Sequence, residues 1–213
     1  MRATDPEPPR DCPRCPRLVA YREENRAAHP DWWNGPAPSF GDPAARLLIV
    51  GLAPGRNGAN RTGRPFTGDY AGVLLYETLI SLGLASGPYQ ARADDGLELV
   101  GCMITNAVRC APPANRPDGS EEAACRSYLA ARIATLPNLR VILTLGDVAR
   151  RNVLKALGIR ASSGSGGHGT PTDAGRYLLI NSYHCSRLNT NTGRLTRQMF
   201  EDVVSRASAA AMA

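Results

Sequence analysis

Four short apolar runs divide the chain, and the stretches between them repeat apolar residues at helical spacing. The runs cover residues 47–50, 100–106, 141–145 and 177–181. None of them alternates strictly between apolar and polar positions, which is typical of strands that helices cover on both faces. The stretches with helical spacing are residues 14–28, 71–84, 120–135, 146–157 and 195–207.

Strand and helix signals alternate along the sequence, and this order favours an α/β fold. We expect three layers, α/β/α, with a central four-stranded parallel sheet whose ligands bind beyond the carboxyl ends of the strands. Ser120 is the expected N-cap of the helix that begins there. The 213 residues suit a single domain, with flexible tails at residues 1–11 and 208–213.

The charge balance is basic, with 25 Lys and Arg against 19 Asp and Glu and a formal net charge of +6. Nearly all the basic residues are arginine, which suits phosphate recognition, although a basic balance alone supports a nucleic-acid partner only weakly. No segment approaches the roughly 20 apolar residues of a membrane span, and residues 1–10 contain no apolar signal region. We therefore expect a monomer in the reducing cytoplasm, near the nucleoid, without membrane contact.

Four of the six cysteines fall into two clusters that are far apart in sequence. Cys12 and Cys15 form a C-x-x-C pair near the start, and Cys110 and Cys125 follow about a hundred residues later. Two such pairs can bind one centre, which favours either an iron–sulfur cluster or a structural zinc ion over disulfides or unrelated core thiols. Cys102 lies inside an apolar run and is expected to be an inert buried thiol.

A glycine-rich segment follows the first apolar run and is a candidate binding loop. It begins Gly51-Leu52-Ala53-Pro54-Gly55 and continues to Asn60. Its glycines let the backbone approach a ligand, but the Lys-Ser/Thr pair of a phosphate-binding P-loop is absent. A sharp turn after a strand is the alternative interpretation. Further on, Phe66 could stack on a base, and Asp69 directly precedes a helix and could simply cap it.

Polar residues also follow two other apolar runs. Asn106 ends one run, where the alternatives are ligand recognition and a strand-end turn. His184 follows the last run and is accompanied by Arg187 and Asn189, which can contact phosphates or bases. A core histidine is the usual alternative for such a position. His168, in a Gly- and Ser-rich stretch, is expected to be a solvated loop residue.

These segments together resemble the uracil-DNA glycosylase superfamily, and most closely its family 5. The resemblance covers Cys12 to Thr196 and rests on four motifs. These are residues 51–55, the run Gly-Ala-Asn-Arg-Thr-Gly-Arg-Pro-Phe-Thr-Gly-Asp at 58–69, Thr-Asn-Ala-Val-Arg-Cys at 105–110, and the segment 184–196. The related family 4 carries Glu where this chain has Leu52. One departure is His184-Cys185-Ser186, where the family normally has His-Pro-Ser, so the backbone here loses the stiffening of a proline.

The resemblance implies an enzyme that cleaves the N-glycosidic bond of uracil, and of other deaminated or damaged bases, in DNA and so initiates base excision repair. It implies a structural [4Fe–4S] cluster on Cys12, Cys15, Cys110 and Cys125. Phe66 would stack on the flipped base, and Asn106 would read its Watson–Crick edge. His184 would stabilise the departing base, and Asp69 would polarise water or steady the cationic sugar. Arg187, with Arg61 and Arg64, would grip phosphates.

Two other functions remain open from the sequence. One is a catalytically impaired iron–sulfur protein of the same fold that binds nucleic acid, which the change at Cys185 keeps open. The other is a zinc-containing module that binds free nucleotides and would lack the visible absorption of an iron–sulfur cluster.

Overall fold

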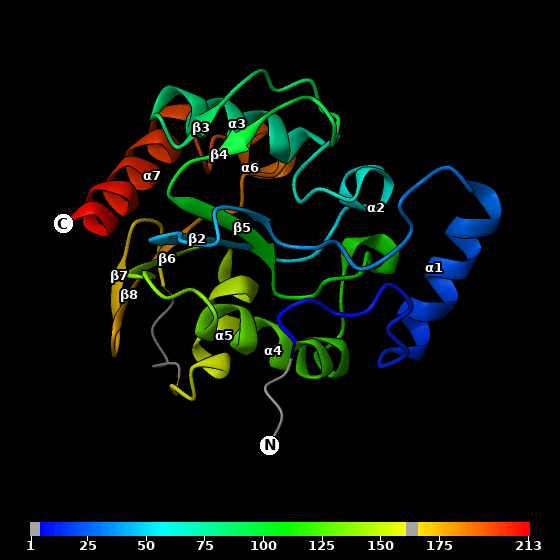
Figure 1. The fold of residues 1–213 in the computed structure, drawn as a ribbon. Helices are drawn as coiled ribbons and strands as arrows, with labels where there is room; N and C mark the ends of the chain where they lie inside the picture. Colours follow the sequence, from blue (N-terminus) through cyan, green and yellow to red (C-terminus); the bar gives the residue numbers. More distant parts are fainter. Residues whose placement is uncertain (1–4, 161–165) are drawn as a thin grey trace.

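The structure is a computed structural model that describes residues 5–160 and 166–213. A six-stranded sheet forms its centre (Figure 1). The strand order is β1-β5-β2-β6-β8-β7. The four central strands are parallel and match the predicted runs, and their bounds are β5 Cys102–Asn106, β2 Leu47–Gly51, β6 Val141–Leu145 and β8 Tyr177–Ser182.

The prediction of a four-stranded sheet is wrong in its number of strands, because an antiparallel strand is added at each edge. These are β1 Phe40–Gly41, which pairs with β5, and β7 Pro171–Ala174, which pairs with β8. β1 is two residues long, and β7, Pro-Thr-Asp-Ala, buries only Ala174. Neither has the buried apolar run by which the central strands are recognised, so the hydrophobic pattern could not find them.

Helices cover both faces of the sheet and complete the three layers (Figure 1). Alternate residues of β2 explain why both faces are apolar: Leu47 and Ile49 belong to one core, and Leu48 and Val50 belong to the other. The first core includes α3 Tyr70–Ser81 and α7 Arg197–Met212. The second includes α4 Gly119–Ala134 and α5 Asp147–Ala156.

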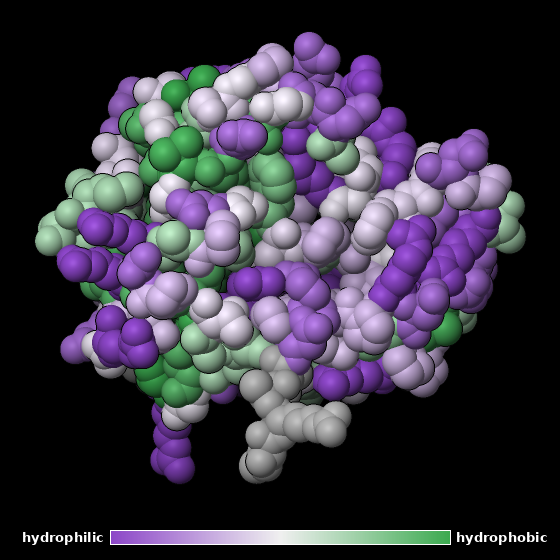
Figure 2. Space-filling model, in the orientation of Figure 1, coloured by the Kyte–Doolittle hydropathy of each residue, from purple (hydrophilic) through white to green (hydrophobic). Residues whose placement is uncertain are grey.

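The helix α1, Pro16–Ala28, lies at the side of this layered body (Figure 1). Its Leu18 packs in a third, smaller core with Cys12, Val108, Cys125 and Tyr128. Its outer surface is hydrophilic (Figure 2). Short elements complete the described chain: α2 Ala59–Thr62, α6 Arg187–Asn191, the 3₁₀ turn Pro113–Asn115, and a two-stranded ribbon of β3 Ala85–Ser86 and β4 Glu98–Leu99.

The N-cap of α4 is Asp118 and not Ser120 as predicted. The Asp118 carboxylate accepts a hydrogen bond from Glu121 N at 2.9 Å, and Glu121 accepts one in return from Asp118 N at 2.8 Å. This reciprocal capping box satisfies two backbone donors, whereas Ser120 could satisfy only one. Ser120 lies in the first turn, and its hydroxyl donates to the Asp118 carboxylate at 2.6 Å.

Both predicted tails are more ordered than expected within the described residues. α7 continues to Met212 and buries Ala211, so residues 208–212 are helical. The alanine-rich composition that suggested fraying instead favours helix. At the other end, the Glu7 carboxylate pairs with Arg109 and Arg132, which anchors the chain there; residues 1–4 of that predicted tail lie outside the described residues. Within the described ranges, no helix has the length and apolar character needed to cross a membrane.

Candidate active site and thiol cluster

A pocket of about 610 Å³ opens at the carboxyl ends of the parallel strands, where the sequence predicted ligand binding. Such a volume is in the usual range for small-molecule sites. The walls come from four predicted segments and from the turn at residues 114–116. The predicted site residues that line it are Leu52, Ala53, Pro54, Gly55, Phe66, Asp69, Asn106, His184 and Arg187.

Gly51 lies beneath the pocket and has a steric reason to be glycine. A Cβ atom there would lie 2.5 Å from both the Asn106 Oδ1 atom and the Phe66 Cζ atom. The missing side chain therefore lets Phe66 and Asn106 come together over the end of β2. Phe66 has a φ of 54°, a strained value for an aromatic residue, and such strain is concentrated at functional sites.

The Asn106 side chain is 2 % exposed, and its Oδ1 has no hydrogen-bond partner among the described residues. Leaving a buried acceptor unpaired costs roughly 1–3 kcal/mol. A ligand in the pocket that brings an N–H to this oxygen would recover that energy. Asn106 is therefore suited to recognise a donor-bearing ligand.

The His184 ring faces Phe66 across the pocket, with the two ring centroids 6.2 Å apart. Burial lowers the pKa of His184, so its imidazole is neutral at neutral pH. Asn189 does not line this pocket; its amide donates to the His184 carbonyl oxygen at 2.8 Å. Cys185 is fully buried, and its thiol lies 3.6 Å from the Ala71 carbonyl oxygen. The backbone around His184 is thus held on both sides without the proline of the usual motif.

Asp69 is both a helix cap and a pocket residue. One carboxylate oxygen, Oδ1, accepts a hydrogen bond from Gly72 N at 3.0 Å and caps α3. The other oxygen faces the glycine-rich loop, where a Cβ atom on Gly58 would lie 2.4 Å from it. Burial raises the pKa of Asp69. The cap interpretation is therefore confirmed, and it leaves Oδ2 available to the pocket.

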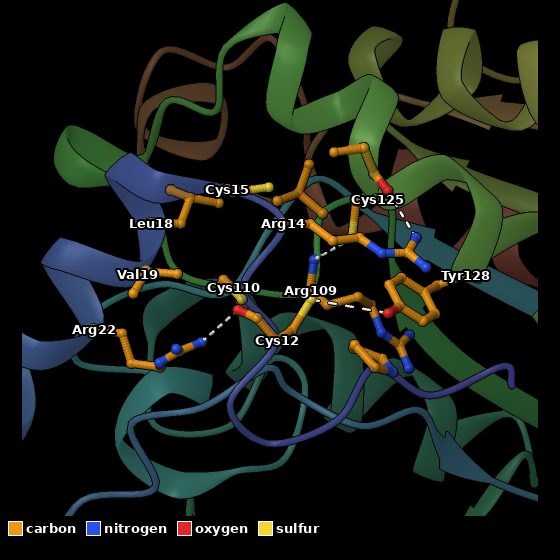
Figure 3. Close-up of a pocket in the computed structure, with 13 residues that line it drawn as sticks. Cys12, Arg14, Cys15, Leu18, Val19, Arg22, Arg109, Cys110, Cys125 and Tyr128 are labelled. Carbon is orange, nitrogen blue, oxygen red and sulfur yellow. Dashed lines mark hydrogen bonds between the residues drawn. The ribbon is translucent and has the colours of Figure 1, made fainter.

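A second cavity brings the four clustered cysteines together (Figure 3). Cys12 and Cys15 precede α1, Cys110 follows β5, and Cys125 lies on α4. The backbone N–H of Arg109 donates to the Cys125 Sγ atom at 3.3 Å. Burial raises the pKa of Cys110 to about 12 and that of Cys125 to about 11. The same burial raises the pKa of any core thiol, so it is the convergence of four cysteines from three separate segments on one cavity that fits a metal centre, since a bound cation ionises such thiols.

Cys102 does not belong to the cluster. It is fully buried in the sheet, its thiol donates to the Leu84 carbonyl oxygen at 3.4 Å, and burial raises its pKa to about 12. The prediction of an inert core thiol is confirmed.

The chain is similar in sequence to known proteins over most of its length. The family model of the Uracil DNA glycosylase superfamily matches residues 38–207. The chain belongs to this superfamily. A type-5 uracil-DNA glycosylase from Thermus thermophilus is 49% identical over 203 residues, 92% of each chain. Another from Pyrobaculum aerophilum is 43% identical over 93% of this chain and 88% of its own. A type-4 uracil-DNA glycosylase from Thermotoga maritima is 34% identical over 74% of each chain.

Two of the arginines that the sequence suggested as phosphate contacts differ in their exposure to solvent. Arg187 is exposed at the pocket, with its guanidinium 5.1 Å from the centre of the Tyr70 ring. Arg64 is buried, and it pairs with both carboxylate oxygens of Asp95 at 2.7 and 2.8 Å. Arg64 therefore stabilises the loop that carries Phe66, and the prediction that it grips phosphate is wrong.

Three further residues that the sequence analysis singled out lie outside the pocket. Arg61 is exposed and donates to the Asn57 carbonyl oxygen at 3.0 Å, beside the pocket wall. Asn60 is buried and donates to Asn34 at 3.0 Å, so its amide is structural. His168 is half-buried and hydrogen-bonded, where a solvated loop residue was expected: its Nδ1 accepts from Tyr183 N at 3.2 Å, and its Nε2 lies 3.1 Å from the Met199 carbonyl oxygen. It thereby holds the strand end that precedes His184.

Two residues of this superfamily member that sequence reasoning missed lie on the pocket wall. Leu188 is 73 % exposed, an unusual state for a large apolar side chain in a polar loop. In the sequence, Leu188 is a single apolar residue between Arg187 and Asn189, and this pattern could have marked it as a candidate contact residue. Arg56 is held by Asn25 Oδ1 at 2.7 Å and by the His29 ring at 3.0 Å. These partners come from α1 and the turn after it, so only the tertiary structure reveals them.

Proposed function

We propose that this protein is a type-5 uracil-DNA glycosylase, which hydrolyses the N-glycosidic bond between uracil and deoxyribose in DNA. The observation that carries the proposal is the buried Oδ1 of Asn106, which has no hydrogen-bond partner among the described residues and lies in a pocket shared with Phe66 and His184. The names of the type-5 relatives support the same activity. We extend the proposal to other deaminated or damaged bases, with base excision repair as the process that the product enters.

Base recognition follows from the chemistry of uracil. Its N3–H donates and its O4 accepts, so one amide side chain such as Asn106 can accept from N3 and donate to O4. The base must leave the duplex stack to reach this pocket. The Phe66 ring, fixed against Gly51, then offers an apolar face on which the flipped base stacks.

Bond cleavage leaves the electron pair on uracil and a cationic centre at C1′ of the sugar. A neutral His184 donates a ring N–H to uracil O2, where negative charge develops, without transferring its proton. Water then adds to C1′, and the proton that it loses is taken up by the departing uracil anion, which leaves neutral uracil and a C1′ hydroxyl. Leu52 offers no carboxylate or amide to orient that water. Asp69 Oδ2, which faces the glycine-rich loop, is the group that would polarise it or stabilise the cation.

DNA contact is assigned to the rim of the pocket. Arg187 and Arg61 are exposed there and would bind phosphates. Leu188 would occupy the gap that the flipped nucleotide leaves in the stack, since an exposed apolar side chain gains burial by entering it.

We assign a [4Fe–4S] cluster to Cys12, Cys15, Cys110 and Cys125. A tetrahedral zinc ion would draw four sulfurs to about 2.3 Å from one point. The four thiols line one cavity and could hold either group, and the resemblance to family 5 favours the cluster. When bound, the cluster supplies structural order, because it joins the segment before α1 to α4.

Single-turnover excision from a uracil-containing oligonucleotide tests the proposed function. We expect uracil release by the parent protein and a loss of ~10²-fold or more in His184→Ala, the scale of removing one preorganised donor. His184→Gln retains an N–H and should be intermediate. DNA affinity should change little in both variants, because phosphate contacts dominate it. A parent protein that contains iron and binds DNA but releases no base would instead indicate the catalytically impaired binder.

A further inference from the structure

Three arginines lie next to one another in a row at the amino ends of the parallel strands, opposite the strand ends that carry the pocket. Each directly precedes a parallel strand: Arg46 precedes β2, Arg140 precedes β6 and Arg176 precedes β8. These three strands are neighbours in the sheet. Backbone hydrogen bonds fix the register here, because Arg140 N donates to the Arg46 carbonyl oxygen at 3.0 Å and Leu178 N donates to that of Arg140 at 2.9 Å. Arg46 and Arg140 are therefore level with one another at the strand spacing of about 4.8 Å, and Arg176 lies one residue beyond Tyr177, which is level with Arg140.

The three side chains are exposed and line one hollow of about 260 Å³ together with the turn 137–139. Like charges on adjacent strands repel one another. In the described part of the chain, none of the three guanidinium groups has a carboxylate within ion-pair distance. The remaining residues, 1–4 and 161–165, contain no Asp or Glu side chain that could pair with them.

The acidic side chains nearest in sequence are used elsewhere. Asp42 accepts hydrogen bonds from the backbone of Ala44 at 2.7 Å and of Gly101 at 3.3 Å. Asp173 accepts one from Gly175 N at 2.9 Å. The row is therefore a concentrated positive charge that the fold itself does not neutralise.

We propose that Arg46, Arg140 and Arg176 form a second phosphate-binding site, which holds a DNA segment other than the one in the pocket. Guanidinium groups match phosphate oxygens in a two-pronged geometry, which favours a phosphodiester chain as the ligand. Strands of five residues span about 17 Å, so a duplex on the catalytic edge does not continue to the far edge. The choice of DNA rests on the proposed function, whereas the placement of an anion site does not.

Such a site gives the enzyme a role in moving between DNA segments. Sequence-independent phosphate contacts allow a protein to slide and hop along DNA. With one DNA segment at the pocket and a second at the arginine row, the protein can hold the new DNA segment before it releases the old one.

The test is a bridging assay with uracil-free DNA. One short duplex is fixed to beads and loaded with protein, and retention of a second, fluorescent duplex is measured. The triple variant Arg46→Gln/Arg140→Gln/Arg176→Gln should retain about tenfold less of the second duplex, and Arg140→Gln alone should reduce the salt slope of retention by about one unit. The matched control is Arg92→Gln/Arg197→Gln/Arg206→Gln, which removes the same charge from exposed arginines elsewhere and should behave like the parent.

Three results would overturn the proposal. The first is equal retention by the two triple variants, because bridging would then come from net charge or from protein dimers. The second is a triple variant that loses binding to poly-glutamate but not to DNA, which would assign the row to an acidic protein. The third is a fall in single-turnover excision from a short uracil oligonucleotide, because the row would then belong to the catalytic contact. Failure of the parent to excise uracil would refute the proposed function, yet bridging could still be measured.

Discussion

Replacing Asp95 by Asn should destabilise the protein more than any exposed substitution in the same loop. Asp95 uses both oxygens: Oδ1 accepts from Arg64 Nη1 at 2.7 Å and Leu97 N at 3.1 Å, and Oδ2 accepts from Arg64 Nη2 at 2.8 Å and Gln90 N at 2.9 Å. The asparagine amide places an NH₂ group against these donors and leaves the guanidinium of Arg64, 4 % exposed, without a counter-charge. Breaking a buried pair in this way costs about 3–5 kcal/mol. For a chain of this length, that corresponds to a Tm lowered by about 6–20 °C.

Urea denaturation of the parent, Asp95→Asn and Asp94→Asn measures this effect. Asp94 is the matched control, because it is the neighbour of Asp95 and pairs with Arg92, two residues before it, but the side chains of Asp94 and Arg92 are exposed, at 73 % and 64 %. Its loss should leave the midpoint unchanged. The double variant Arg64→Gln/Asp95→Asn should recover part of the stability, since the unpaired charge is gone. Equal midpoints for the two single variants would refute the account of Arg64 as a structural residue.

The same pair predicts a pH dependence. The Arg64 guanidinium holds the pKa of Asp95 below its usual range. The stabilisation is therefore complete above the unfolded-state pKa of about 3.9 and is lost as the pH falls below that value. The difference in unfolding free energy between the parent and Asp95→Asn should be constant above about pH 5 and shrink in acid. A constant difference down to acid unfolding would contradict this.

Three further substitutions test separate parts of the site. Cys110→Ser should abolish the visible absorption, lower the iron content and reduce stability, while Cys102→Ser keeps its iron; unchanged iron in Cys110→Ser would remove the cluster assignment. Arg187→Ala should weaken binding equally for all DNA sequences and reduce the salt slope by about one unit, and a loss confined to uracil-containing DNA would place Arg187 in the base pocket. Cys185→Pro should excise uracil as fast as the parent or faster, and slower excision would mean that the buried thiol positions His184 better than a proline does.

Much of the fold could be predicted from the sequence because its signals are local. The four parallel strands are short apolar runs, and the five long helices carry helical spacing and end within a few residues of the predicted limits, except that α7 runs on to Met212. Parallel topology then brings every strand's carboxyl end to one edge, which is why Asn106 and His184 could be expected near the glycine-rich loop. The edge strands β1 and β7 were not predicted, because β1 has only two residues and β7, Pro-Thr-Asp-Ala, contains no apolar run.

The roles of individual polar residues were decided only by tertiary contacts. Arg61 and Arg64 look alike in sequence, yet one is exposed and the other meets Asp95, 31 residues away, in the interior. Asn60 and Asn106 are both buried amides, but Asn60 has Asn34 as a partner while the Oδ1 of Asn106 has none in the described chain. Burial and partner choice depend on where distant segments pack, and no local pattern encodes that.

The sequence by itself determined the layered α/β fold, the edge of the sheet that carries the chemistry and the two cysteine pairs, because each follows from spacing along the chain. Only the tertiary structure decided that these pairs line one cavity, that Asp69 caps α3 while presenting its second oxygen to the pocket, and that Leu188 remains exposed. The physical reason is that hydrophobic periodicity fixes which face of an element is buried, whereas side-chain chemistry depends on which partner the buried or open space brings within a few ångströms.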